Sequence, residues 1–151
     1  MTACQFETRT LTAYEAQQLR DDILRAGLPP GSVYRTDLAA DTLHVGAFVD
    51  NALVAVATVC SELFPEEPER PAWRLRGMAT RPAWQGQGLG SQLARRCISH
   101  ATDHGGNLIW CTARASAFPF YRALGFEVCG PSFRRSEYDR EWFAKMMREL
   151  P

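Results

Sequence analysis

The sequence predicts a mixed α/β (α+β) fold, and three observations carry this prediction. Short apolar strands alternate with amphipathic helices, a glycine-rich turn joins a strand to a helix, and no repeat or low-complexity linker divides the chain. With 151 residues, of which 46% are hydrophobic and 23% charged, the chain has the size and composition of one domain. We therefore expect a single domain over residues 1–151.

The helix predicted nearest the N-terminus begins with a capping box. The sequence TAYE places Thr12 three residues before a glutamate, and the helix runs to about Arg25 before Gly27 and a proline pair stop it. Two apolar stretches follow, Leu43–Val49 and Leu53–Cys60, with turn residues between them. They predict an antiparallel hairpin whose second strand, apolar on both faces, is central in the sheet.

The second half of the chain alternates more regularly between strands and helices. Apolar residues recur every fourth position from Leu89 to Ala101, which is typical of an amphipathic helix. A short helix ends at Gly125, and we predict a strand rather than a helix for EWFAKMMREL near the C-terminus. The predicted elements are a strand at 73–80, a helix at about 88–103, a strand at 108–113, a short helix at 116–124, and strands at 126–130 and 141–150.

Charge and hydropathy exclude several function classes. Seventeen basic and seventeen acidic residues cancel, so the chain lacks the positive charge on which nucleic-acid binding relies. The longest apolar run, Ala52–Cys60, is far shorter than the ~18 residues of a membrane span, and the N-terminus shows no signal-peptide core. We expect a cytoplasmic protein with neither nucleic acid nor membrane as partner.

The cysteines indicate neither disulfides nor a metal site. They are odd in number, widely scattered and without a CxxC pair, so we expect buried thiols and no bound metal. The five cysteines are Cys4, Cys60, Cys97, Cys111 and Cys129.

Three glycines stand where the long helix should begin. Gly86, Gly88 and Gly90 are costly there, because each glycine inside a helix costs about 0.5–1 kcal/mol relative to alanine. A glycine-rich turn between a strand and a helix lets the backbone approach an anion, and the first N–H groups of the helix point at it. The pattern predicts a cradle for a phosphate or diphosphate.

Two known phosphate-binding loops do not fit this stretch. A P-loop needs a lysine and a hydroxyl residue directly after its last glycine, whereas Ser91 and Gln92 follow Gly90. A dinucleotide fingerprint needs GxGxxG with an acidic residue about twenty positions on, whereas this loop reads GxGxG and Trp110 stands near that place. On the loop alone, a glycine turn without any ligand is the alternative.

Two motifs together resemble a known family. QGQGLG at 85–90 matches the Q/RxxGxG/A signature of the GCN5-related N-acetyltransferases (GNAT), and FYRALGF at 120–126 is similar to that family's second signature. They occur in the family's order, separated by one helix and one strand. The resemblance implies a mostly antiparallel sheet of six to seven strands, with two splayed parallel strands and about four flanking helices.

The resemblance also implies a site for acetyl-CoA as co-substrate, with no metal. Backbone groups of the strand before the turn would bind the pantetheine amides, and N–H groups of the turn would hold the diphosphate. Relatives often have an asparagine near Thr112, where this chain offers only a hydroxyl. The implied cofactor-binding residues are Met78, Ala79, Thr80, Gln85, Gly86, Gln87, Gly88, Leu89, Gly90, Ser91, Thr112, Ser116 and Tyr121.

Tyr121 matches the family's tyrosine that protonates the departing sulfur, so the resemblance implies that it is the general acid. Many relatives carry a glutamate as base on the strand before the turn, but residues 73–80 contain no acid. Glu62 is the substitute we predict, with a solvated charge at a loop edge as its alternative. His44 comes second, and a lone histidine on a strand is more often structural. A water relay, or an acceptor that arrives neutral, would need neither residue.

We therefore expect an N-acetyltransferase that moves acetyl from acetyl-CoA directly to an amine, without a covalent enzyme intermediate. The main alternative is a regulatory or interaction module that binds acyl-CoA without turnover, because the usual base is missing. An unrelated mononucleotide-binding domain would share the glycine turn but has no use for FYRALGF. The family commonly pairs through its last strands, so a homodimer is also implied.

Overall fold

The computed structural model describes residues 5–137 and 139–151. Seven strands and three α-helices alternate in these residues, with short 3-10 helices at Pro82–Trp84 and Ala115–Ala117. The elements are β1 (Glu7–Thr10), α1 (Ala13–Leu24), β2 (Leu43–Val49), β3 (Ala52–Ser61), β4 (Ala72–Thr80), α2 (Leu89–Asp103), β5 (Leu108–Arg114), α3 (Phe118–Ala123), β6 (Glu127–Val128) and β7 (Phe143–Glu149).

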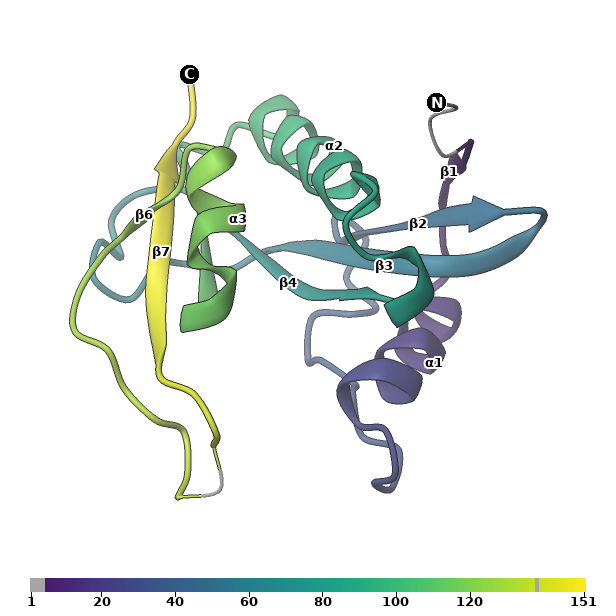
Figure 1. The fold of residues 1–151 in the computed structure, drawn as a ribbon. Coiled ribbons are helices and arrows are strands. Elements are labelled where there is room, and N and C mark those ends of the chain that lie inside the picture. The colour runs from purple at the N-terminus through teal and green to yellow at the C-terminus, as the bar shows by residue number, and fades with distance from the viewer. Residues whose placement is uncertain (1–4, 138) are drawn as a thin grey trace.

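The strands form one sheet in the order β1-β2-β3-β4-β5-β7-β6. Every neighbouring pair is antiparallel except β4 and β5, which are parallel. In Figure 1, strands β2, β3 and β4 run roughly horizontally across the molecule, whereas β7 runs roughly vertically at the left. The mixed α/β fold, with its mostly antiparallel sheet of seven strands, is therefore as predicted.

The parallel pair is short, and this opens the sheet. Partners run only from Ala72↔Leu108 to Arg74↔Trp110, while β4 continues to Thr80 and β5 continues to Arg114. Beyond Arg74, therefore, the edge of β4 that faces β5 has no strand partner. The two splayed parallel strands are as the family resemblance implied.

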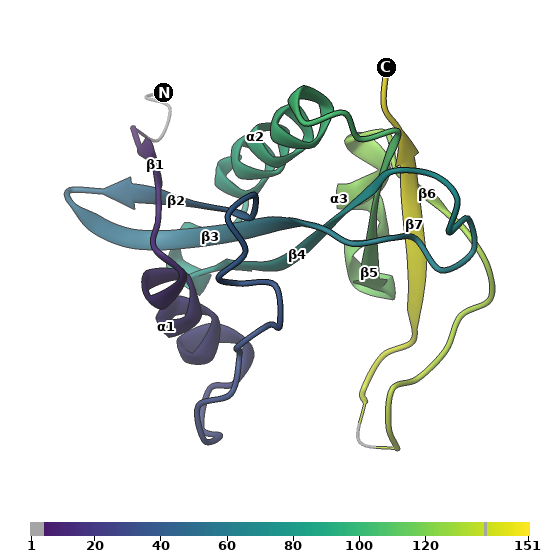
Figure 2. The ribbon, with the colours of Figure 1, turned by 180° about the vertical axis from the view of Figure 1, so that it is seen from behind.

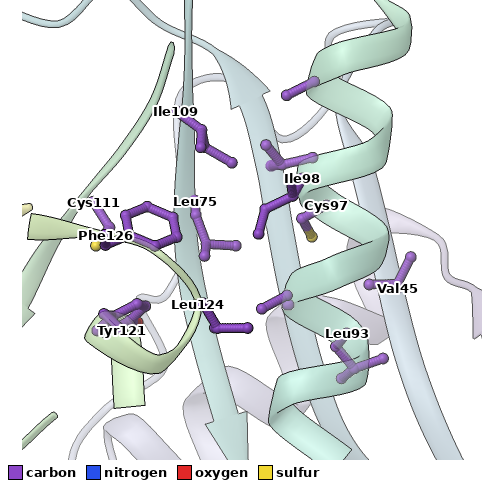
Figure 3. Close-up of a cluster of buried hydrophobic side chains, with 14 of the residues drawn as sticks. Val45, Leu75, Leu93, Cys97, Ile98, Ile109, Cys111, Tyr121, Leu124 and Phe126 are labelled. Carbon is purple, nitrogen blue, oxygen red and sulfur yellow. The ribbon is translucent and has the colours of Figure 1, made fainter. Parts of the chain in front are cut away.

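Helices cover both faces of the sheet. Helix α1 lies on one face of β3 and β4, and α2 lies on the other (Figures 1 and 2). The larger core lies on the α2 face and includes Leu75 of β4 and Leu93 and Cys97 of α2 (Figure 3). Burying a leucine of this kind contributes about 1.5–3 kcal/mol. A smaller cluster, with Leu19 and Val56, lies under α1.

Local signals in the sequence place these elements well. Thr12 and Glu15 form the predicted capping box, with the Glu15 amide donating to Thr12 Oγ1 at 3.2 Å. The hairpin turns through Asp50 and Asn51 at φ 50° and 66°, the left-handed pair that a two-residue hairpin turn requires. The C-terminal stretch is strand β7, also as predicted.

The described residues hold three α-helices beside the about four that the resemblance implied, and the segment between α1 and β2 forms backbone turns. Strand β1 was not predicted, since its four residues carry no alternating apolar pattern. In the described part of the chain, no helix has the length and apolar character to cross a membrane.

The described cysteines are free thiols. Cys60, Cys97 and Cys111 are buried, as predicted, and Cys129 is half-buried. Cys4 lies outside the described residues. Burial raises the pKa of Cys97 and Cys111 to about 12, so neither is a thiolate near neutral pH.

Candidate active site

A cleft of about 810 Å³ opens where β4 and β5 part. Its walls come from the end of β4, the glycine turn, the start of α2, the end of β5 and helix α3. This volume lies in the range typical of small-molecule and cofactor sites. The cleft lies at the break in the sheet, so its walls include backbone that has no strand partner.

The glycine turn presents main-chain N–H groups to the cleft. Gly86 and Gly88 have φ of 76° and 86°, and a Cβ at either position would meet nothing within 4 Å. Gly88 caps α2, and the first helical bond runs from the Gln92 amide to the Gly88 carbonyl at 3.1 Å. The amides from Leu89 to Ser91 therefore have no acceptor within the helix, which makes the turn a ready anion site.

A bulge in β4 brings the strand into the cleft. Val56 and Thr58 of β3 oppose Ala79 and Arg76 of β4, so β4 carries one residue more than its partner. Gly77, at φ 66°, takes up the distortion. A Cβ there would lie 2.7 Å from Nε of Arg20, so only glycine fits.

Tyr121 lies in the first turns of α3 and lines the cleft, with only 9% of its surface exposed. Its ring contacts Phe120 and Phe126 edge-on, at 5.1 and 5.6 Å between centroids. Among the described residues its hydroxyl has no hydrogen-bond partner, so a ligand in the cleft can supply one. Burial raises the pKa of Tyr121 far above its usual value and keeps the phenol protonated.

Twelve of the thirteen predicted cofactor residues line this cleft, and Gln87 does not. The side chains of three of these twelve residues already form hydrogen bonds with other residues of the protein. The amide and Oγ of Ser116 donate to Glu141 at 2.9 and 3.0 Å, Thr112 Oγ1 accepts from Arg74 at 3.4 Å, and Gln85 Nε2 donates to the Thr80 carbonyl at 3.1 Å.

Glu62 directly follows β3 and does not itself line the cleft. Its carboxylate accepts a hydrogen bond from Nη1 of Arg74 at 2.8 Å and lies 3.7 Å from Nη1 of Arg76. Both arginines line the cleft. The predicted base is thus in contact with the cleft wall, through two guanidinium groups.

A buried ion pair holds the segment between α1 and β2 against the sheet. Arg20, fully buried, donates to both carboxylate oxygens of Asp37 at 2.9 and 3.1 Å. Burial alone would raise the pKa of Asp37, but hydrogen bonds from Arg20, the Tyr34 amide and Gln17 outweigh it and hold the pKa below its usual range.

His44 belongs to this buried cluster rather than to the cleft. Its Nδ1 lies 2.8 Å from Thr58 Oγ1 and its Nε2 lies 2.9 Å from the Asp37 carbonyl. Both ring nitrogens are therefore occupied by structural hydrogen bonds, in agreement with the structural role expected of a lone histidine on a strand.

Tyr34 connects the buried cluster to the cleft. The guanidinium of Arg20 stands 4.1 Å from the centre of its ring, and that of Arg76 stands 3.8 Å from it. Sequence reasoning missed Tyr34, Arg74 and Arg76 as cleft residues. One signal was present: the arginines of WRLRG alternate on an otherwise apolar strand, so both point to the same face.

A sequence profile of the acetyltransferase (GNAT) family matches residues 10–126. The chain belongs to this family. It is also 31% identical over 131 residues to the uncharacterized N-acetyltransferase YitI of Bacillus subtilis, across 84% of this chain and 86% of YitI. The chain is thus an acetyltransferase by family, which confirms the resemblance carried by its two motifs.

Solved structures share the fold at low identity. Escherichia coli ElaA superposes with a TM-score of 0.78 at 20% identity, over 96% of this chain and 100% of ElaA. YncA of Salmonella typhimurium, solved with its cofactor acetyl-CoA, superposes with a TM-score of 0.75 at 15% identity, over 97% of this chain and 94% of YncA. Both place this chain in the GNAT fold.

Proposed function

We propose that this chain transfers an acetyl group from acetyl-CoA directly to an amine. The observation that carries the proposal is the cleft itself, where the glycine turn, the unpaired edge of β4 and Tyr121 meet. Membership of the GNAT family supports the reaction class. The same fold in YncA, solved with acetyl-CoA, supports the co-substrate.

Main-chain groups would hold the co-substrate, which supplies the acetyl thioester. The unpaired edge of β4 at Met78–Thr80 suits the two amides of the pantetheine arm, because backbone there can bind an extended chain as a strand would. The turn from Gln85 to Ser91 suits the diphosphate. Each charge-assisted hydrogen bond contributes about 1.5–3 kcal/mol, so a few of them give micromolar binding.

Two protons move in this reaction, and we assign one residue to each. As the C–N bond forms and the C–S bond breaks, the Tyr121 hydroxyl gives its proton to the sulfur and is reprotonated from solvent. The amine proton passes through a water to Glu62, whose carboxylate accepts a hydrogen bond from Arg74 at 2.8 Å. The high pKa of Cys97 and Cys111, and their absence from the cleft wall, favour transfer without a cysteine intermediate.

One observation favours a second candidate function, an acyl-CoA-binding module without turnover. Among the described residues that line the cleft there is no aspartate, glutamate or histidine. A chain that had lost its base would keep the cradle for the co-substrate and still bind acyl-CoA. This candidate differs from the first in turnover alone.

The deciding experiment measures free CoA over a panel of amines. The purified chain is incubated with acetyl-CoA and each amine in turn, CoA thiol is followed with time, and mass spectrometry looks for one added acetyl group on the amine. We expect at least one amine to accelerate CoA release and to be acetylated. Binding of acetyl-CoA without acceleration by any amine would establish the binding module instead. Thermal stabilisation by ATP but not by acetyl-CoA would contradict both candidates.

A further inference from the structure

Two arginines of β4 face the part of the cleft that lies away from the glycine turn. Arg74 and Arg76 alternate along the strand, directly before the Gly77 bulge, and both line the cleft. Their side chains are 20% and 25% exposed. At about 3.3 Å per residue, Arg76 stands roughly 13 Å along β4 from Thr80, where the strand reaches the turn.

Arg76 is short of hydrogen-bond partners. Among the described residues it makes no hydrogen bond, and its nearest carboxylate oxygen, on Glu62, is 3.7 Å away. The Nε atoms of both Arg74 and Arg76 are buried without a partner. A guanidinium carries five N–H donors, and a buried donor left unpaired costs about 1–3 kcal/mol. Burial, and then the neighbouring Arg74, lower the pKa of Arg76.

The charges around this part of the cleft do not balance. Glu62 is one carboxylate shared between Arg74 and Arg76. Arg114 and Arg135 line the same cleft, and of these Arg135 is paired with Asp139 at 3.3 Å. The cleft wall therefore carries a surplus of positive charge, and an anion is the ligand that would compensate it.

The two guanidinium groups are also held in place. The Arg76 guanidinium stands 3.8 Å from the centre of the Tyr34 ring, and that of Arg74 stands 4.6 Å from the centre of the Trp110 ring. Tyr34 is fixed in turn by the buried Arg20, which contacts the same ring. A planar guanidinium held in this way matches the oxygens of a carboxylate or phosphate, and little entropy is lost on binding.

We infer that the amine acceptor carries an anionic oxygen group, a carboxylate or a phosphate, and that Arg76 binds this group with help from Arg74. The inference rests on the proposed function for the acceptor's amine. The diphosphate of acetyl-CoA does not account for these arginines, because the proposed path of the co-substrate places it at the glycine turn, beyond Thr80.

The test is binding of matched amines to the chain saturated with CoA, followed by calorimetry. Glycine is compared with glycinamide, and O-phosphoethanolamine with ethanolamine, so that each pair differs in the anionic group and the two pairs separate carboxylate from phosphate. We expect at least one anionic probe to bind at least tenfold more tightly than its counterpart without the anionic group. Arg76→Gln should remove this preference, since one charge-assisted hydrogen bond is worth about tenfold or more.

Arg9→Gln is the matched control. Arg9 also stacks on an aromatic ring, 4.2 Å from the centre of Phe48, and pairs with a glutamate, Glu7, at 2.9 Å, but it does not line the cleft. It should keep the preference, and both variants should bind acetyl-CoA like the wild type.

The outcomes separate the two proposals. Equal binding of the probes with and without the anionic group, no binding of any anionic probe, or an unchanged preference in Arg76→Gln would overturn the anionic acceptor, whether or not the chain turns over. The preference for the anionic probe could depend on Arg76 in a chain whose CoA release no amine accelerates. That result would support the anion site and overturn the transferase reaction alone.

Discussion

The part of the cleft around the glycine turn is lined mainly by residues of one continuous segment, 77–91, whose main-chain groups we propose as the co-substrate site; we call it the cofactor half. The part around Arg76 is formed by side chains from separate segments, namely Tyr34, Arg74 and Arg76 on the wall, with Glu62 behind them, which we call the acceptor half. A main-chain site tolerates many side chains, because the binding groups are common to all residues. A side-chain site changes with every substitution.

Loss of the Tyr121 hydroxyl should have the largest effect, because we propose this group as the general acid of the reaction. We expect Tyr121→Phe to lower kcat by about 10² to 10⁴, the usual contribution of a general acid, and to leave the Kd of acetyl-CoA unchanged. Tyr14→Phe, at an exposed position on α1, should leave both quantities at the wild-type value. Normal turnover by Tyr121→Phe would remove this residue from the mechanism.

The buried ion pair between Arg20 and Asp37, which holds the segment that carries Tyr34, should contribute more to stability than an exposed ion pair does. Asp37→Ala leaves the Arg20 charge buried without its partner, and we expect a loss of about 3–5 kcal/mol in the free energy of unfolding, measured with urea. Asp22→Ala breaks the exposed pair with Arg81, 3.4 Å long, and should cost no more than about 1 kcal/mol. Similar losses in the two variants would show that the buried pair does not anchor this segment.

Two glycines at opposite ends of α2 allow a test of whether the glycine turn binds the diphosphate of acetyl-CoA. Gly88 and Gly105 have φ of 86° and 79°, and both have open space where a Cβ would stand. Alanine at either position should cost about 1–2 kcal/mol of stability, because the left-handed conformation is strained. Only Gly88→Ala should also weaken acetyl-CoA binding, by about tenfold, the value of one charge-assisted hydrogen bond. Equal acetyl-CoA affinity in the two variants would argue against the turn as the diphosphate site.

The smallest expected effect is the pH dependence of the stability that the Asp37 carboxylate contributes. The pKa of Asp37 is lowered in the folded state, so the carboxylate stabilises the fold above its unfolded pKa of about 3.9, and this contribution is lost as the pH falls through the lower folded value. The stability difference between wild type and Asp37→Asn should therefore be largest above about pH 4 and shrink below it. A difference that grows as the pH falls would have the wrong sign for this account.

The cofactor half could be predicted from the sequence because its signals are local. Gly86 and Gly88 adopt the left-handed conformations that only glycine takes readily, and the amphipathic pattern from Leu89 shows where α2 begins. The capping box at Thr12 and the turn at Asp50 are local in the same way.

The acceptor half could not be predicted, because its contacts join residues far apart in the chain. Arg20 reaches Thr58 across 38 positions, and Arg76 meets Tyr34 only because the segment between α1 and β2 folds back over the sheet. In the cofactor half, too, the bulge at Gly77 could not be predicted, because it depends on register with β3, which no pattern within β4 reveals. Glu62 was singled out by elimination, without any signal for its two arginine neighbours.

A structure of the chain bound to CoA would test the central claim most directly. The account predicts diphosphate oxygens within about 2.7–3.2 Å of main-chain nitrogens of the 85–91 turn, and the sulfur beside the Tyr121 hydroxyl. A diphosphate bound by Arg74 and Arg76 instead, or a sulfur remote from Tyr121, would contradict it.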